Sequence, residues 1–567
     1  MHVGRVNARG GRGTARGPDA DARALRAARS GHSPAAAIVL AALLALPALA
    51  SAATYHVRPD GGTAQQCDGT QDRAYPGKGT GVACAWSHPF IALPPDRPAR
   101  IAGGDTLLIA MGNYMMGFGA PETERCRRES AHECVAGAVP SGPDARRPTR
   151  ILGAGHDGRC ARAPELWGTG GARSVLRLDG SNHVELACLE LTDRSPCIKS
   201  HNHKGNAPGE TSRCPRGEPS APWAEAGIVA KDSRNVVLKR LNIHGLAANG
   251  IRAGRLRDWR LEHVVLRANG WAGWDGNVGD DASGGSSNSG RITFSGGEIA
   301  WNGCAERYPS TEIFGCWAQQ HGGYGDGLGT AKTGGDWVFE DVHVHHNTSD
   351  GLDLLYLDGT GSVTIRRVRA ERNAGNQIKT AGPALIENSV LVGDCAYFTG
   401  MRGANLVERD HCRASGNTVS ITHRNDSLVV IRNNTITGQG DCLLLTVDGS
   451  RNARAVVQNN AFIGDEEWKP GKGGRDRSCA HYAEKSEARI EFANNLFWQV
   501  KGGFCPAGNV CNRDPRLAPP ANGRFNPQPR AGSALVGAGA AVSGVDHDFH
   551  RKSRPRGRKP DIGAIQL

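Results

Sequence analysis

The chain has 567 residues, of which 77 are glycine, about twice the usual share. No Gly-X-Y period accompanies this excess, so collagen is excluded, and 39% hydrophobic residues are too many for a wholly disordered chain. The net charge of +12 suits an anionic partner, which could be a nucleic acid or an acidic polysaccharide. Abundant glycine in a chain with a core predicts many tight turns between short strands rather than long helices.

The N-terminal segment carries the pattern of an export signal. Residues 1–50 contain seven Arg and two Asp, and an uncharged apolar run extends over Ala35–Ala48. Small residues of the A-x-A type follow at 50–52. We therefore expect residues 1–52 to be a signal peptide with a basic N-terminal extension, and the protein to be secreted, either extracellular or periplasmic. The run is short for a membrane span, so we expect no stable membrane insertion after its removal, with a single membrane anchor as the alternative.

All 16 cysteines follow this segment, an even number that favours disulfides in an exported chain. None of the closely spaced pairs has the spacing of a zinc site, so we expect loop staples rather than a metal cluster. The close pairs are Cys67/Cys84, Cys126/Cys134, Cys304/Cys316, Cys395/Cys412 and Cys505/Cys511.

From about residue 175 the chain repeats a short phrase, in which alternating apolar residues precede a polar break that is often Asn-Gly. Leu238 and Leu261 are 23 residues apart, and Ile365 and Ile386 are 21 residues apart. Strand-length phrases at this spacing, without helical periodicity, predict an all-β stacked solenoid in which neighbouring coils share one core. The recurring Asn suits left-handed turn geometry and hydrogen bonding along a ladder, so we interpret it as structural.

The repeat also sets the expected domain boundaries. Residues 53–175 lack the phrase and are rich in Cys, Pro and Gly, so we expect them to form an N-terminal cap and loops. Residues 176–511 are expected to form the parallel β-helix. The Pro/Gly-rich residues 512–567 are expected to form a C-terminal cap.

The densest polar constellation contains three aspartates and one lysine. Asp326 precedes Asp350 by 24 residues and Asp353 precedes Lys379 by 26, each about one solenoid turn, so the four side chains are predicted to form a column on one face. Three carboxylates repel one another unless a cation neutralises them, and oxygen ligands suit Ca²⁺. A neutral Lys379 beside such a cation could act as a base.

The same run resembles family nine of the polysaccharide lyases, the calcium-dependent, pectate-lyase-like β-helix enzymes. The matching residues are Asp326-Gly327 with Lys332, Ser349-Asp350-Gly351-Leu352-Asp353-Leu354, and Gln377-Ile378-Lys379. The resemblance implies a right-handed parallel β-helix, with calcium held by Asp326, Asp350 and Asp353 and with Lys379 as the Brønsted base. The chain departs from the family at Ser349, where the family has a first Asp, and at Gln-Ile before the lysine in place of Gly-Phe.

Weaker candidates surround this set. We expect substrate contacts from Tyr324, Lys332, Arg367 and Arg402. The arginines around Arg367, which are Arg366, Arg369 and Arg372, could bind uronate carboxylates or form a solvated face. For His343, His345 and His346 a ladder or surface role is favoured over a metal site. Trp271, Trp274, Asp275, Asp280 and Asp281 lie in a Gly/Ser-rich stretch that is a sugar-stacking platform or an insertion.

These observations predict a monomeric, secreted enzyme that cleaves an acidic, uronate-containing polysaccharide by calcium-assisted β-elimination. The alternatives are a polygalacturonase-like glycoside hydrolase, suggested by Ile378-Lys379-Thr380 and Asn347-Thr-Ser-Asp350, and a non-catalytic polysaccharide-binding or surface protein. Hydrolysis needs paired carboxylates across the scissile bond. A nucleic-acid partner is not expected, because export and disulfides argue against it and no basic module with interleaved aromatics is visible.

Overall fold

The computed structural model describes residues 52–199, 214, 221–279, 286–316, 325–394, 398, 416–469 and 474–567. Ala52–Leu567 form one compact unit. Nearly all of its regular structure is β-strand, as the composition predicts. Within the described ranges, none of the helices has the length and apolar character needed to cross a membrane.

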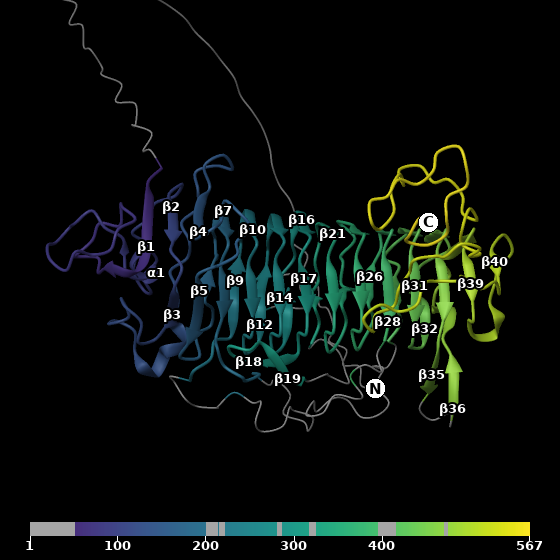
Figure 1. Ribbon diagram of the computed structural model, residues 1–567, viewed down its shortest axis with the longest axis horizontal. Coiled ribbons are helices and arrows are strands. Elements are labelled where there is room, and N and C mark those ends of the chain that lie inside the picture. The colour runs from purple at the N-terminus through teal and green to yellow at the C-terminus, as the bar shows by residue number, and fades with distance from the viewer. Residues whose placement is uncertain are drawn as a thin grey trace, which may run out of the picture. The chain divides into compact units, whose positions relative to one another are not determined.

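Three long parallel sheets make up the unit (Figure 1). Over the described residues the first sheet contains, in order, β1 (Thr54–Gly62), β2 (Thr106–Ile109), β4 (Thr149–Gly153), β7 (Asn182–Ala187), β10 (Arg234–Lys239), β13 (Arg257–Glu262), β16 (Ser289–Ser295), β21 (Asp336–Glu340), β24 (Val363–Arg366), β27 (Ala384–Glu387), β30 (Leu428–Arg432), β33 (Arg454–Gln458) and β38 (Arg489–Ala493).

The second sheet contains β3 (Asn113–Gly117), β5 (Glu165–Thr169), β8 (Glu190–Thr192), β11 (Asn242–His244), β14 (Val265–Arg267), β17 (Glu298–Ala300), β22 (His343–His345), β25 (Arg369–Glu371), β28 (Val390–Gly393), β31 (Thr435–Gly438), β34 (Ala461–Gly464), β39 (Leu496–Trp498) and β40 (Val510–Cys511). The third contains β6 (Leu176–Arg177), β9 (Ala226–Lys231), β12 (Asn249–Gly254), β15 (Ala272–Asp275), β20 (Leu328–Gly329), β23 (Leu352–Leu354), β26 (Ile378–Ala381), β29 (Val419–Thr422), β32 (Cys442–Val447) and β37 (Cys479–Glu484).

Each full coil gives one strand to each sheet in turn, so that β10, β11 and β12 are followed by β13 directly beside β10. This arrangement confirms the predicted all-β solenoid. Two antiparallel hairpins project from the coils, β18 (Cys304–Arg307) with β19 (Glu312–Cys316) and β35 (Glu466–Lys469) with β36 (Gly474–Arg477). The short helices among the described residues are α1 (Pro89–Ala92) and the 3₁₀ turns η1 (Arg128–Glu133) and η4 (Lys501–Gly503).

The strand stack begins earlier than the repeated phrase suggests. β1, β2 and β4 already belong to the first sheet and β3 and β5 to the second, although all five lie within the residues that we expected to form a cap and loops. Long loops separate these strands and hide the repeat in the sequence. Beside β1, the fully buried helix α1 covers the apolar start of the stack (Figure 1).

The core follows from the strand period of two. In β13 the side chains of Trp259 and Leu261 point inward and are buried, while Arg260 between them is exposed. Trp274, from the Gly/Ser-rich stretch, is also fully buried and meets Trp259 and Trp337 in edge-to-face contacts with ring centroids 6.0 and 6.1 Å apart. Trp274 therefore stabilises the core and offers no surface for stacking a sugar.

Buried asparagines form two ladders at the turns, as the structural interpretation of Asn requires. In the first ladder each side-chain amide donates to the next residue's side-chain oxygen at 2.8–3.0 Å, in the order Asn269, Asn302, Asn347, Asn373 and Gln377. The second runs through Asn434, Asn460, Asn495 and Asn509 at 2.9–3.0 Å. The ladders supply hydrogen bonds that these buried turns could not obtain from water.

Disulfides staple the loops within the described residues. Four of the predicted pairs are confirmed, and they are Cys67–Cys84, Cys126–Cys134, Cys304–Cys316 and Cys505–Cys511. Three further bonds join Cys160–Cys188, Cys197–Cys214 and Cys442–Cys479. The pair Cys395/Cys412 lies outside the described residues.

The C-terminal segment packs along the outward face of the second sheet. Ala564 and Ile565 contact Val390 and Val392 of β28, and the backbone N–H of Ala564 donates to Thr435 Oγ1 at 3.1 Å. Ile562 belongs to a second apolar cluster on β34 and β39. The last residues thus close the outward face of the later coils of this sheet.

We predict that Asn460→Ala lowers the free energy of unfolding by about 2–4 kcal/mol, because it leaves the buried carbonyl of Ile431 and the N–H of Asn434 without their partners. Urea unfolding followed by circular dichroism measures this change. Asn452→Ala, at an exposed turn, is the control and should change stability by less than about 0.5 kcal/mol. Equal effects of the two substitutions would contradict the structural role of the ladder.

Candidate active site

The four residues of the predicted column lie together on the third sheet. Asp353 of β23 pairs in register with Lys379 of β26, so both side chains leave the sheet on its outward face. Asp326 and Asp350 sit on the turns that lead into β20 and β23. Stacking of successive coils therefore turns a sequence spacing of 24–26 residues into side-chain contact.

Lys379 is the centre of the cluster. Its Nζ donates to Asp353 Oδ2 at 2.7 Å and to Asp350 Oδ2 at 3.1 Å. The other oxygen of Asp350, Oδ1, accepts from the backbone N–H and the side-chain amide of Asn376 at 2.7 and 2.8 Å. Asp326 Oδ1 accepts from the backbone N–H of Asp350 at 3.0 Å. These bonds fix each carboxylate relative to the ammonium group.

The charges of the cluster shift the pKa values of Asp353 and Lys379. Burial raises the pKa of Asp353 to about 7, Lys379 opposes that rise, and the charges of Asp350 and Asp326 add to it. Burial disfavours the charge of Lys379, but Asp350 and Asp353 outweigh it and hold the pKa of the ammonium above its ordinary value. With all four groups ionised, the ammonium of Lys379 therefore lies among three carboxylates.

The carboxylates of the cluster suit a small cation. Gly329 stands in register between Asp275 and Asp353, and a Cβ added to it would lie 2.9 Å from Asp326 Oδ2. The glycine thus leaves room for the Asp326 carboxylate, which the side chain of any other residue would displace. Carboxylate oxygen donors fit a hard divalent cation such as Ca²⁺. Across the described ranges, no three Asp, Glu, His or Cys side chains already converge as a metal site.

Ser349, which replaces the family's first Asp, is fully buried and brings no carboxylate to the cluster. Asp358, another nearby acid, does not replace it. Its Oδ1 accepts from the backbone and the hydroxyl of Thr360 at 2.9 and 2.6 Å, and its Oδ2 accepts from Ser287 at 3.3 Å. The acidic groups of the site are therefore Asp326, Asp350 and Asp353.

The predicted substrate contacts are not all brought to this face. Lys332 is exposed just after β20. Arg367 lies at the corner between β24 and β25, where its Nε donates to Asp341 Oδ1 at 2.7 Å, and it is only 11% exposed. That corner joins the first and second sheets, so Arg367 is separate from Lys379. Tyr324 and Arg402 lie outside the described residues.

The other arginines, His343 and His345 also pair with carboxylates of the protein, while His346 bonds His345 and stacks on Trp301. Arg366 bonds Glu340 at 2.6 Å, Arg369 bonds Glu371 at 2.6 Å, and Arg372 bonds Asp394 at 3.1 Å. His343 bonds Glu371 at 3.0 Å and His345 bonds Glu298 at 3.2 Å, in agreement with a ladder role for the histidines. Asp280 and Asp281 lie outside the described residues.

The site lies in a row of outward side chains that was not predicted from the sequence. The outward positions one coil apart are Arg252, Asp275, Gly329, Asp353, Lys379, Ser420, Leu445 and Tyr482. Arg252 lies beside Asp275, with Nε 3.7 Å from Asp275 Oδ2, and Tyr482 is 56% exposed. The regular spacing is lost between Asp275 and Gly329, because the hairpin β18–β19 is inserted there. The row nevertheless places outward side chains of successive coils on both sides of Lys379, of which Ser420 and Leu445 are buried.

A comparison with protein families supports the fold. A family model described as a right handed beta helix region matches residues 353–512. Together with the three parallel sheets, this match makes the chain a right-handed parallel β-helix, as expected. No curated protein matches the sequence.

Among solved structures, the chain is similar to pectate lyase Pel9A, with 13% identity, a TM-score of 0.42 and coverage of 91% of this chain and 97% of that one. It is similar to an alginate lyase from Paenibacillus sp. str. FPU-7, with 13% identity, a TM-score of 0.32 and coverage of 71% and 94%. The complex of XylC with xylose shows 10% identity, a TM-score of 0.43 and coverage of 91% and 98%.

We predict that Lys379→Met lowers the free energy of unfolding at pH 8, measured in the presence of a chelator, by about 3 kcal/mol, because it leaves buried carboxylates without their cation. Without the ammonium, the pKa of Asp353 rises further above its unfolded value, because Lys379 opposes that rise in the native protein. The penalty is therefore largest above this folded pKa and shrinks as the pH falls toward 5 and Asp353 takes up a proton. Urea unfolding at pH 8 and pH 5 measures both effects.

The matched control for this experiment is Lys501→Met, which breaks an ion pair with Asp476 that is partly exposed and should cost less than about 1 kcal/mol at either pH. A loss in Lys379→Met that is the same at pH 5 and pH 8 would show that Lys379 does not neutralise the carboxylates.

Proposed function

We propose that this right-handed parallel β-helix is a secreted polysaccharide lyase that cleaves a uronate-containing polysaccharide by β-elimination, with Lys379 as the base. The observation that carries the proposal is the position of one lysine among three carboxylates on an outward sheet face, in the middle of a row of outward side chains. The disulfides of the described coils support an oxidising compartment and hence secretion.

In this reaction a base removes the proton from C5 of a uronate, next to the ring carboxylate. The C5–H electron pair forms the C4=C5 double bond, the C4–O4 bond breaks, and the leaving oxygen takes up a proton. The new non-reducing end is therefore an unsaturated uronate. Catalysis requires a neutral base beside C5 and positive charge near the carboxylate, where negative charge develops.

The protein's own groups meet the positional part of this requirement. Nζ of Lys379 is held at the outward face by Asp350 and Asp353, and Asn376 fixes Asp350 in turn. The negative charge around Nζ favours the protonated form, so any positive charge that offsets the carboxylates lowers the pKa of Lys379 toward that of a base. The site thus links the protonation of the lysine to the charge balance of the cluster.

The donor set supports calcium as the cofactor. Asp326, Asp350 and Asp353 would hold the ion, beside Gly329. Bound calcium supplies positive charge that offsets the carboxylate charge and stabilises the enolate-like anion. Asp350 and Asp353 also bind the ammonium of Lys379, so an ion held by these carboxylates would lie close to the proposed base.

A glycoside hydrolase is the second candidate, and the raised pKa of Asp353 favours it. A carboxyl with a pKa of about 7 can protonate a leaving group near neutral pH. The two reactions differ in their products, since hydrolysis creates reducing ends without a double bond.

We predict that wild-type protein incubated with pectate, alginate or a uronate-containing glycosaminoglycan forms an unsaturated product, detected by its ultraviolet absorbance. Lys379→Ala should lower the rate about 10³-fold, the usual scale for loss of a general base. Lys501→Ala, which removes a lysine paired with Asp476 outside the cluster, is the control and should retain full activity. Reducing ends without the ultraviolet signal would favour the hydrolase, and binding without either signal would favour a non-catalytic role.

Calcium binding is tested separately by titration calorimetry in the absence of polysaccharide. We predict one calcium ion per chain, bound at least about tenfold more weakly after Asp326→Asn or Asp353→Asn, because affinity depends on the number of charged ligands. Asp546→Asn, at an exposed pair with Arg556, is the control and should leave binding unchanged. Absence of binding to the wild type would remove calcium from the proposal.

A further inference from the structure

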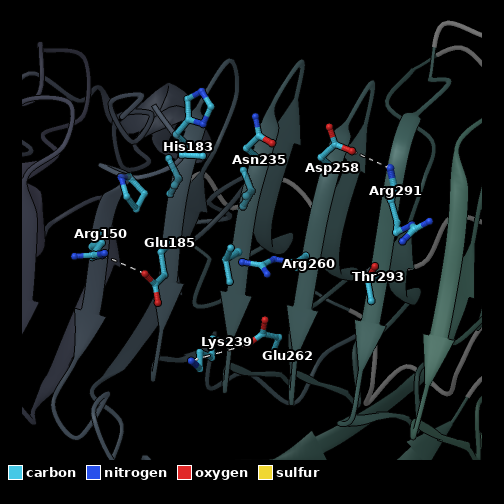
Figure 2. A pocket seen from close by; sticks show the side chains of 15 residues that line it. Arg150, His183, Glu185, Asn235, Lys239, Asp258, Arg260, Glu262, Arg291 and Thr293 are labelled. Atoms are coloured by element: carbon cyan, nitrogen blue, oxygen red, sulfur yellow. Dashed lines mark hydrogen bonds and ion pairs between the residues drawn. The ribbon is translucent and has the colours of Figure 1, made fainter. Parts of the chain in front are cut away.

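A pocket on the first sheet has no role in the reaction described above. Figure 2 shows side chains of five neighbouring strands, β4, β7, β10, β13 and β16, that surround it. Its volume is about 480 Å³. The Lys379 cluster is on the third sheet, so the two sites occupy different faces of the β-helix.

The register of the strands explains why polar groups gather here. The outward positions one coil apart are Arg150, Glu185, Val237, Arg260 and Thr293. The alternate positions, such as Val236 and Trp259, are buried in the core. Five strands at about 4.8 Å spacing span roughly 19 Å, which accommodates several linked sugars crossing the strands.

Two guanidinium groups at this pocket are available to a ligand. Arg150 pairs with Glu185 at 3.2 Å, and Lys239 lies 3.9 Å from Glu262. Arg260 on β13 is exposed, and its guanidinium has no carboxylate partner within the described part of the chain. Arg291 on the adjacent β16 is likewise exposed and engages Asp258 only through its backbone N–H, at 3.0 Å.

We infer that this pocket is a second, non-catalytic binding site for an acidic polysaccharide, with Arg260 and Arg291 holding its carboxylate groups. A guanidinium matches the two oxygens of a carboxylate. The remaining lining provides hydrogen-bonding groups for hydroxyls, among them Asn235, Thr293 and Glu262 (Figure 2). The inference rests on the proposed function only for the choice of a uronate as the carboxylated sugar.

The charge pattern favours a polysaccharide over a nucleic acid. The lining carboxylates Glu185, Asp258 and Glu262 alternate with the basic side chains, which suits a chain with one charge per sugar and many hydroxyls. They would repel a chain of closely spaced phosphates. The lining contains no Phe, Tyr or Trp, and its one aromatic ring, the imidazole of His183, does not form a row on which successive bases could stack.

A second site would change how the enzyme binds a polymeric substrate. A polymer held on the first sheet raises the effective concentration of its other segments at the third sheet, without any new contact at Lys379. The expected consequence is stronger binding of long chains than of short ones.

The test is titration calorimetry with short oligogalacturonates, using the full chain with Lys379→Ala so that no substrate is consumed. The parent should show two binding events, and the double variant R260Q/R291Q should lose one or bind it at least about tenfold more weakly. The control R451Q/R489Q removes the same charge from exposed arginines of later coils and should keep both events. Circular dichroism should show the same folded state for all variants, because neither Arg260 nor Arg291 has a carboxylate partner in the described chain.

Two results would overturn the inference. In the first, R260Q/R291Q shows both oligogalacturonate-binding events with the affinities of the parent, or with affinities no weaker than those of R451Q/R489Q. In the second, a DNA duplex binds through Arg260 and Arg291 more tightly than the oligogalacturonate does. If R260Q/R291Q loses one binding event and the wild-type protein forms no unsaturated product, the results would support this binding site and reject the proposed lyase activity.

Discussion

The structure depends on the hydrogen-bonded register between successive coils. Each parallel strand pairs with the equivalent strand of the next coil, so residues 21–26 positions apart in the simple coils become side-chain neighbours about 4.8 Å apart. The same constraint aligns the asparagine ladders, the polar row of the first sheet and the column of Asp353 and Lys379. Residues of one site in this fold therefore become neighbours across successive coils, although they are far apart in the sequence. A site can be assembled from one residue per coil.

The charges around Lys379 determine whether this lysine can act as the base of the proposed reaction. Asp350 and Asp353 hold the ammonium in place, and the same carboxylates keep it protonated. A lysine in this setting becomes a base only when other positive charge satisfies its partners. The Asp326 carboxylate beside Gly329 and the raised pKa of Asp353 indicate where such charge would bind. The arrangement combines a structural ion pair with the elements of a proton-transfer site.

The sequence predicted the solenoid and the column of four residues because both follow from spacing alone. It could not predict the start of the stack, since long disulfide-bonded loops separate β1, β2 and β4 and conceal their period. Arg367 was expected near the substrate but lies at the corner between two other sheets, because spacing along the chain does not reveal which sheet a turn residue joins. Arg252 and Asp275 were missed as part of the outward row because the inserted hairpin breaks the spacing before Gly329.

The proposed reaction takes place at the Lys379 cluster on the outward face of the third sheet. The most direct test is a crystal structure of the Lys379→Ala protein with a bound uronate oligosaccharide. We expect a sugar chain that crosses β20, β23 and β26. In one sugar ring, C5 and the carboxylate should face position 379 and the aspartates beside it. An oligosaccharide bound with no sugar on this face, or with C5 directed away from position 379, would contradict it.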